Sequence, residues 1–357
     1  MPPPQPNFDR LLTVLWRRGE PDRVPFIELK HDDEIIEAVL GERITGLSHD
    51  PRQAVREYAR RCVTFHHRLG YDCVTAAPGV PMRYERVLAD DTAGTTRQSR
   101  AWQSETSGPI ATMEDFERYP WPRPAEISYG LFEAIAAVMP EGMKIIGRRS
   151  GVLENVMWTM GFQGLAFALR EDPPLCRAMF DRVGSLTLNI FENMADMEAV
   201  GALWLGDDLG FKTQTMISPG DLRRYVFPWH KRIAAAAHAR GKPFLIHSCG
   251  NIEAVMPDLI GEVGIDARHS FEDVITPVTE AKRLYGDRIA LLGGVDMDLL
   301  ARGSVDHVRA ATRRILEACM PGGGYALGSG NSVANYVKVE NFLAMLDEGW
   351  KVGRYGA

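Results

Sequence analysis

The 357-residue chain contains eight short apolar segments, and each is followed by a stretch whose apolar residues have helical spacing. A short apolar run followed by a helical pattern is typical of one strand-helix unit in a parallel sheet. Eight such units in one chain favour a closed ring of strands over an open doubly wound sheet. We therefore predict an α/β fold, a single (β/α)8 (TIM) barrel. The predicted strands are residues 24–29, 72–77, 143–147, 202–206, 244–246, 264–267, 289–292 and 325–327.

One barrel domain is predicted to span residues 1–357, because such a barrel needs about 250 residues and the apolar content of 45% supports a large core. Residues 1–22, which contain an amphipathic helix at Phe8–Arg18, are predicted to be an N-terminal helical extension. Residues 82–103 alternate charged, apolar and small residues. They indicate short strands in a small β flap insertion outside the main sheet.

The composition excludes several classes of function. The net charge is −6 with both signs interspersed, which argues against a nucleic-acid surface. Five cysteines at irregular spacing argue against a disulfide framework and favour a reducing, cytoplasmic setting. No stretch reaches the roughly 18 apolar residues of a membrane helix, and the start of the chain lacks a signal pattern. We therefore expect a soluble cytoplasmic protein that binds neither membranes nor nucleic acid.

The stretch from Pro243 to Asn251, PFLIHSCGN, carries the clearest chemical signal. Its apolar strand ends in His247 and Cys249, two residues apart, and side chains two apart in an extended chain share a face. One nitrogen and one sulfur donor would form half of the shell of zinc or another borderline-soft metal. The bland alternative is a hydrogen-bonded core histidine beside a cysteine that acts as a small apolar residue.

The ends of the other predicted strands would meet these two residues at the carboxyl face of the barrel, where such folds place their chemistry. This set contains histidines, a thiol and several carboxylates, which favours an enzyme over a binding module. Asp296 and Asn331 are equally consistent with helix caps. The full set is Lys30, His31, Arg148, Glu154, Asp207, Asp208, His247, Cys249, Asn251, His269, Glu272, Asp296, Ser329, Asn331, Asn335 and Tyr336.

Residues 200 to 350, with HSCGN, the strand exit ALLGGVD and the Gly-rich exit before Glu340-Asn341, resemble the uroporphyrinogen decarboxylase superfamily. That superfamily also contains zinc-dependent methylcobamide:coenzyme M methyltransferases and related corrinoid or folate methyl-transfer enzymes. The resemblance implies a (β/α)8 barrel with a cleft at the carboxyl ends of the strands, often in a homodimer.

Two features place the chain nearer to the methyltransferase branch than to the true decarboxylases. The decarboxylases carry an early arginine-rich stretch that holds substrate carboxylates, whereas this chain has Phe26 to Asp32 there, without arginine. They then carry an essential aspartate, whereas the second predicted strand here exits through Ala76-Ala77-Pro78-Gly79. A porphyrinogen with several carboxylates would lack cationic partners in this stretch.

The methyltransferase branch binds zinc through His-x-Cys and a further cysteine at the last strand exit. His247 and Cys249 match the first two positions, but the third falls on Asn331, or on Ser329 if a gap is allowed. Neither is a thiolate, so the chain departs from the pattern. We predict Glu154 as the third metal ligand, with Asp207 or Asp208 as alternatives.

The resulting prediction is a methyltransferase that moves a methyl group between a methyl-corrinoid or methyl-tetrahydrofolate and a metal-activated acceptor. A separate corrinoid protein is a candidate partner. The alternatives are a metal-free decarboxylase or lyase acting on a tetrapyrrole or smaller acid, and a corrinoid- or tetrapyrrole-binding carrier. The predicted roles are catalytic for Asp207, Asp208, His269 and Tyr336; substrate-binding for Lys30, His31, Arg148, Asn331 and Asn335; and metal-binding for His247, Cys249 and Glu154.

Overall fold

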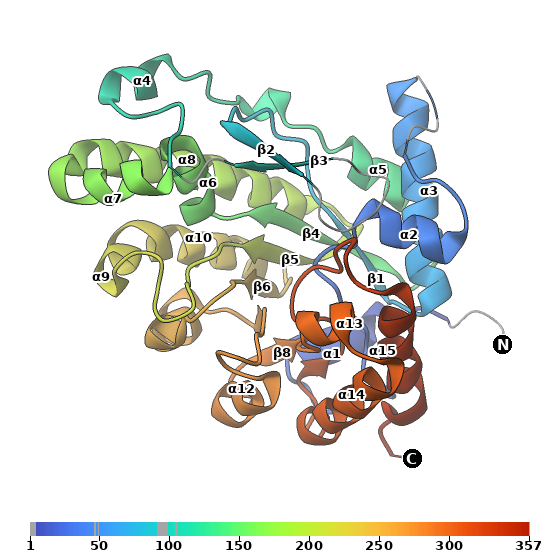
Figure 1. The fold of residues 1–357 in the computed structure, drawn as a ribbon. Coiled ribbons are helices and arrows are strands. Elements are labelled where there is room, and N and C mark those ends of the chain that lie inside the picture. Colours follow the sequence, from blue (N-terminus) through green and yellow to red (C-terminus); the bar gives the residue numbers. More distant parts are fainter. Residues whose placement is uncertain (1–4, 46–47, 49, 91–98, 104–105, 357) are drawn as a thin grey trace.

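A seven-stranded parallel sheet forms the centre of the computed structural model, which describes residues 5–45, 48, 50–90, 99–103 and 106–356 (Figure 1). The strand order is β1-β4-β5-β6-β7-β8-β9, so sheet neighbours follow one another along the chain. The strands are β1 (Cys73–Ala76), β4 (Lys144–Ser150), β5 (Val200–Gly206), β6 (Phe244–His247), β7 (Ala267–His269), β8 (Ala290–Leu292) and β9 (Tyr325–Ala326). The predicted α/β fold with parallel strands is confirmed for these seven.

The segment predicted as the first strand, residues 24–29, does not form a strand. Leu327 exchanges two backbone hydrogen bonds of 2.9 Å with it, within a single parallel bridge. On the other side, the carbonyl of Leu29 accepts a hydrogen bond from Thr75 Oγ1 of β1 (3.0 Å). Pro25 has no N–H to donate, which limits the ladder. The segment therefore lies between β9 and β1 without being a regular strand.

Two further strand predictions need correction. The strand predicted at residues 264–267 begins only at Ala267, because Gly264 still caps the preceding helical turn with a φ of +79°. The strand predicted to end at Gly147 continues to Ser150, so Arg148 lies within β4 and not in the loop after it.

Helices surround the sheet in Figure 1. The helical segment that begins after Ser218 is interrupted by a π-helical turn. The α-helices are α1 (Phe8–Leu15), α2 (Asp33–Leu40), α3 (Pro51–Leu69), α4 (Met113–Arg118), α5 (Gly130–Ala136), α6 (Val152–Met160), α7 (Phe162–Glu171), α8 (Pro173–Asp196), α9 (Pro219–Asp221), α10 (Phe227–His238), α11 (Met256–Asp258), α12 (Val278–Tyr285), α13 (Met297–Arg302), α14 (Val305–Cys319) and α15 (Val339–Val352). The 3-10 turns are η1 (Pro124–Glu126) and η3 (Glu253–Val255), and the π turns are η2 (Leu222–Val226) and η4 (Leu259–Val263).

The inner face of the sheet is formed by alternate strand residues that pack against one another and against α1. Helix α1 covers the amino end, where the Phe8 N–H donates to the carbonyl of Gly142 just before β4 (2.8 Å). The predicted N-terminal extension thus contributes to the core. At the opposite, carboxyl end of the sheet lie the side chains that follow the inner-face residues by two positions along each strand. The inner-face cluster is Phe8, Leu11, Val14, Leu15, Ile27, Cys73, Ile146, Ala202, Trp204, Leu245, Ala267, Ala290, Leu292 and Ala326.

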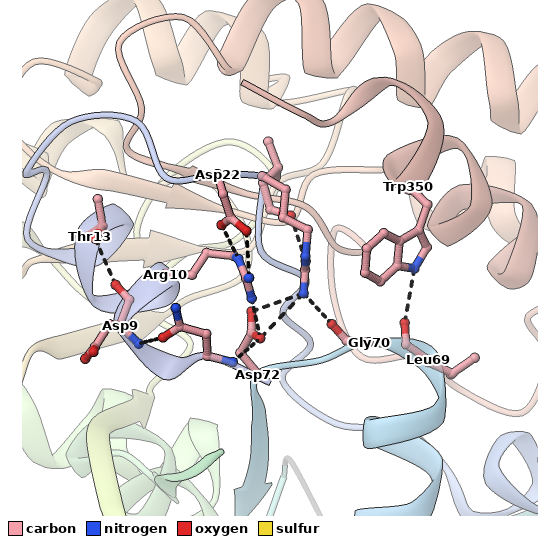
Figure 2. A network of polar contacts seen from close by, with 11 residues as sticks. Asp9, Arg10, Thr13, Asp22, Leu69, Gly70, Asp72 and Trp350 are labelled. Atoms are coloured by element: carbon pink, nitrogen blue, oxygen red, sulfur yellow. Dashed lines mark hydrogen bonds and ion pairs between the residues drawn. The ribbon is translucent and has the colours of Figure 1, made fainter. Parts of the chain in front are cut away.

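A buried polar network fastens α1 to the sheet (Figure 2). Asp72, just before β1, is 1% exposed and accepts a hydrogen bond from Arg10 Nη1 at 2.6 Å. Arg10 also forms a two-point ion pair with Asp22 (2.5 and 2.8 Å). Arg23 Nη2 donates to the carbonyl of Gly70 (2.8 Å) and lies 3.4 Å from the Asp72 carboxylate. One buried carboxylate therefore joins α1, the 22–23 segment and β1.

The predicted flap is confirmed as a two-stranded antiparallel sheet, β2 (Arg86–Asp90) and β3 (Ser99–Gln103), separate from the main sheet (Figure 1). Residues 91–98 of the predicted flap, like residues 1–4 of the predicted extension, lie outside the described residues. Within the described part of the chain, every helix is too short or too polar to cross a membrane.

Candidate metal centre

The loop after β6 is held against the loop after β5 by two glycines. Gly250 has a φ of +76°, and a Cβ there would lie 2.4 Å from the backbone of Gly210. Asn251 and Phe211 form an antiparallel bridge across the same contact. Only glycine permits so close an approach of two backbones. The contact brings the residues that follow β5 beside Cys249.

Among the described residues, one group of His, Cys, Asp and Glu side chains could hold a metal ion: Asp208, His247 and Cys249. Their ligand atoms all lie within 4.8 Å of one another. His247 Nε2 lies 3.4 Å from Cys249 Sγ and 3.6 Å from Asp208 Oδ1. The backbone N–H of Cys249 donates to the same Asp208 oxygen (2.8 Å). The carboxylate of Asp208 thus lies beside the predicted pair, His247 and Cys249.

The three donors fit a zinc ion. Ligands at the usual zinc distances of about 2.0–2.3 Å, arranged tetrahedrally, lie roughly 3.3–3.8 Å from one another. The two separations that involve His247 Nε2 are 3.4 and 3.6 Å. One nitrogen, one sulfur and one oxygen are ligands that zinc accepts, and a fourth position would remain for a substrate.

The electrostatics of the three groups also favour a cation. Burial raises the pKa of the Cys249 thiol well above its usual range, and the nearby Asp208 charge adds to the effect. Burial likewise raises the pKa of Asp208 and lowers that of His247 to about 4, with a smaller contribution from the Arg148 charge to the latter. Two anionic ligands are therefore costly here on their own, and a divalent cation would offset that cost.

Glu154, the predicted third metal ligand, does not belong to this group, whereas Asp208, one of the two predicted alternatives, does. Glu154 lies in the first turn of α6, and its backbone N–H donates to Asp207 Oδ1 (2.9 Å). Burial, and then the charges of Asp208 and Asp207, raise the pKa of Glu154. Glu154 therefore lies close to the charges of Asp207 and Asp208 without belonging to the group of candidate ligands.

Asp207, predicted to be catalytic, caps α6. Its Oδ2 accepts hydrogen bonds from the backbone N–H groups of Val152 and Leu153 (2.9 and 3.1 Å). His230 Nε2 lies 2.7 Å from the same oxygen, and the Asp207 side chain is fully buried. These contacts fix Asp207 at the start of α6, and its predicted catalytic role stays a prediction.

His269, also predicted to be catalytic, lies behind His247. Their Nδ1 atoms are 2.8 Å apart, and His269 Nε2 lies 3.1 Å from the carbonyl oxygen of Ser329. Because His269 is fully buried, its contact with the site passes through His247. Metal-bound histidines commonly use their second ring nitrogen in this way.

Asn331, one of the two residues predicted at the third cysteine position, donates a hydrogen bond from its Nδ2 to Cys249 Sγ (3.2 Å). It also lines a pocket of about 960 Å³ together with Tyr336, which is 47% exposed. The predicted catalytic role of Tyr336 stays a prediction, but its position beside this pocket is compatible with substrate contact.

Three predicted substrate-binding residues, Lys30, His31 and Asn335, lie in irregular segments near β9. Lys30 is about half-exposed and pairs with Asp32 (3.2 Å). His31 is 4% exposed and packs in a cluster of aromatic rings with Phe65, so it belongs to the core. The backbone N–H of Asn335 also donates to Asp32 (3.1 Å). The structure therefore gathers Lys30 and Asn335 around Asp32.

The fourth predicted substrate-binding residue discussed here, Arg148, lies on β4. It lies two residues beyond the inner-face residue Ile146, so it extends from the inner face at the carboxyl end. Its Nε is buried and has no hydrogen-bond partner among the described residues. The groups that affect its pKa besides burial are Tyr58 and Arg149, neither of which is an anion at neutral pH. Arg148 is thus a partly buried cation without a carboxylate partner among the described residues.

Sequence reasoning missed Glu28. Its side chain is 3% exposed and contacts Ser329 through both oxygens (2.8 and 2.5 Å). Burial raises its pKa to about 8. The available signal was one acidic residue within an otherwise apolar segment.

The fold and the site together define an α/β enzyme whose chemistry lies at the carboxyl ends of parallel strands. The sequence matches the family "Uroporphyrinogen decarboxylase (URO-D)" over residues 101–350. The chain therefore belongs to the uroporphyrinogen decarboxylase family, as its motifs predicted.

Curated relatives carry the names of two different activities. A uroporphyrinogen decarboxylase of Anaeromyxobacter dehalogenans is 26% identical over 261 residues, which cover 68% of this chain and 70% of the relative. The methylcobamide:CoM methyltransferase MtaA of Methanosarcina barkeri is 26% identical over 132 residues, or 37% of this chain and 36% of the relative. The solved structure of a methyltransferase from Methanosarcina mazei shares the fold, with a TM-score of 0.71 and 18% identity over 96% of this chain and 97% of that one.

Proposed function

We propose that the protein is a zinc-dependent methyltransferase of the uroporphyrinogen decarboxylase family. The observation that carries the proposal is the convergence of Asp208, His247 and Cys249 at distances suited to one zinc ion. These three residues would hold the metal, which would lower the pKa of a thiol or similar acceptor and make it nucleophilic. The relative named a methylcobamide:CoM methyltransferase supports a corrinoid-linked methyl transfer.

The residues around the cluster would prepare it for this task. Asn331 would donate its amide hydrogen to the Cys249 sulfur and stabilise the thiolate. His269 would keep the His247 ring in place through the bond between their Nδ1 atoms. The pocket beside Asn331 would receive a substrate next to the metal.

Metal analysis of the purified full chain tests this proposal. We expect about one equivalent of zinc per chain, loss of methyl transfer from methylcobalamin to a small thiol after chelation, and recovery when zinc is returned. Methyltetrahydrofolate is the second donor to assay. Full methyl transfer by metal-free protein would contradict the proposal.

A second candidate is a metal-free decarboxylase, which the relative named uroporphyrinogen decarboxylase favours through its longer match. Release of carbon dioxide from a porphyrinogen, unchanged by a chelator, would select it. The absence of arginine from Phe26 to Asp32 counts against a substrate with several carboxylates.

We further propose that Arg148 binds an anionic group of the substrate, since its charge lacks a carboxylate partner in the described structure. In thermal unfolding of the wild type, acetate, sulfate or phosphate at ten times its dissociation constant should stabilise by about 1.4 kcal/mol, or roughly 2 °C for a chain of this size. Arg148→Gln should lose this shift. Arg223→Gln is the control and should keep it, because Arg223 Nε and Nη2 already pair with the two carboxylate oxygens of Asp258 (2.8 and 2.9 Å). An equal shift in Arg148→Gln would refute the assignment.

We also propose that residues 24–29 and the seven strands together form the eight-membered barrel of the family, that the protein is a homodimer, and that a separate corrinoid protein delivers the methyl group. Sedimentation of the protein, alone and with such a carrier, tests the two assembly proposals.

A further inference from the structure

Residues 329–331, just beyond β9, touch the candidate metal centre on two sides. The carbonyl oxygen of Ser329 lies 3.1 Å from His269 Nε2, and the Asn331 amide donates to Cys249 Sγ at 3.2 Å. One short segment therefore reaches both the imidazole side and the thiol side of the site.

The Ser329 carbonyl fixes which ring nitrogens carry hydrogen. A carbonyl only accepts, so His269 Nε2 must donate to it. His269 is fully buried between this carbonyl and another imidazole, where a positive charge would be costly, so it is neutral and its Nδ1 is an acceptor. His247 Nδ1, 2.8 Å away, must then be the donor. His247 Nε2 is left with a free lone pair, and that is the atom nearest to Cys249 and Asp208.

Glu28 holds the same segment from the other end of the chain. Its Oε1 accepts from the Ser329 N–H (2.8 Å), and its Oε2 lies 2.5 Å from Ser329 Oγ. Ser329 Oγ is also 2.6 Å from the carbonyl oxygen of Asn331. The single hydroxyl hydrogen satisfies both contacts when it points to Asn331 and a protonated Glu28 donates to Ser329 Oγ.

We propose that Glu28 is a positioning residue for the metal centre, since it clamps residues 329–331 and thereby orients both His247 and Cys249 toward the ion. The metal part of this inference rests on the proposed function. The orientation of the histidine rings does not, because the hydrogen bonds that set it are formed by the protein alone.

Protonation of Glu28 agrees with its surroundings. Burial raises its pKa to about 8, and the hydrogen bonds from Ser329 only partly oppose the effect. The titratable groups that face it are Tyr71 and Tyr325, whose own pKa values burial raises well above the usual range, so both are neutral. Because the folded-state pKa lies above the ordinary value of 4.5, the clamp is intact at low and neutral pH and is lost as pH rises through about 8.

Two substitutions separate positioning from simple folding. Glu28→Gln keeps an acceptor for the Ser329 N–H and a donor for Ser329 Oγ, whereas Glu28→Leu removes both. At pH 7 the dissociation constant for Co²⁺, read from thiolate-to-cobalt absorption, should stay within about threefold for Glu28→Gln and rise roughly 10- to 100-fold for Glu28→Leu. Above about pH 8 the wild type should bind Co²⁺ more weakly than Glu28→Gln does.

Glu348→Gln is the control, because Glu348 is a buried carboxylate paired with Arg313 in another part of the structure. It should lower the unfolding temperature and leave Co²⁺ affinity unchanged. Nitrogen-15 spectra of metal-free protein supply a second readout: His247 should carry its hydrogen on Nδ1 in the wild type and Glu28→Gln, and lose this preference in Glu28→Leu.

A folded Glu28→Leu variant with wild-type Co²⁺ affinity and wild-type histidine tautomers would overturn the proposal. If the wild type binds no Co²⁺, the zinc part of the proposed function fails, and the tautomers of the metal-free protein still decide whether Glu28 positions the rings.

Discussion

Replacing Cys249 with serine is expected to weaken zinc binding by at least about 100-fold, since zinc sites that total about 10–16 kcal/mol lose roughly 3 kcal/mol with one of four ligands. Serine keeps nearly the size of cysteine, but its hydroxyl is a poor substitute for a thiolate as a zinc ligand. Competition with a chromophoric chelator measures the change, and methyl transfer should fall with it.

The other cysteines provide the control for this prediction. Cys319 is fully buried, and its Sγ contacts the carbonyl of Val278. Cys319 does not belong to the candidate metal site of Asp208, His247 and Cys249. Cys319→Ser should therefore change stability but not zinc content, while Asp208→Asn should weaken zinc because it removes the ligand charge. Zinc affinity that is unchanged in Cys249→Ser would exclude Cys249 as a ligand.

Replacing Asp72 with alanine is expected to lower the free energy of unfolding by about 3–5 kcal/mol, the usual effect of removing one partner from a buried ion pair. The variant would leave two buried guanidinium groups, Arg10 and Arg23, without the carboxylate they share (Figure 2). It would also free the backbone N–H of Asn7, which donates to Asp72 Oδ1 (2.8 Å). Urea unfolding followed by circular dichroism measures the loss.

Asp22→Ala is the matched control, because Asp22 pairs with the same Arg10 but its side chain is 66% exposed. Exposed ion pairs are worth about 1 kcal/mol or less, so the effect should be much smaller. Equal losses in the two variants would show that burial of Asp72 does not govern the stability of the network.

The parallel fold and the His-x-Cys pair were predictable because both have local signatures. Strand-helix alternation is visible in apolar spacing, and His247 and Cys249 share a face wherever the chain is extended. The short strand β7 was misplaced by three residues because the apolar Ile265 precedes it in a connection after the Gly264 cap. Burial alone does not distinguish a connection from a strand.

Spacing alone could not decide which of the candidate carboxylates lies beside His247 and Cys249. Asp207 and Asp208 are adjacent at the end of β5, so their side chains point to opposite faces: one to the helix α6, the other to the site. The choice depends on where α6 begins relative to β5, which is a tertiary property. Glu28 was missed for a related reason, because its partner Ser329 lies 301 residues away.

The bonds between residues 24–29 and the region around Leu327 also constrain how the molecule is made. During synthesis this segment leaves the ribosome about 300 residues before Leu327, so its pairing on that side must wait until the region around Leu327 has emerged. Closure between such distant residues carries a large loop entropy and slows folding. We therefore expect residues 24–29 to complete their packing late in folding, after the region around Leu327 has formed.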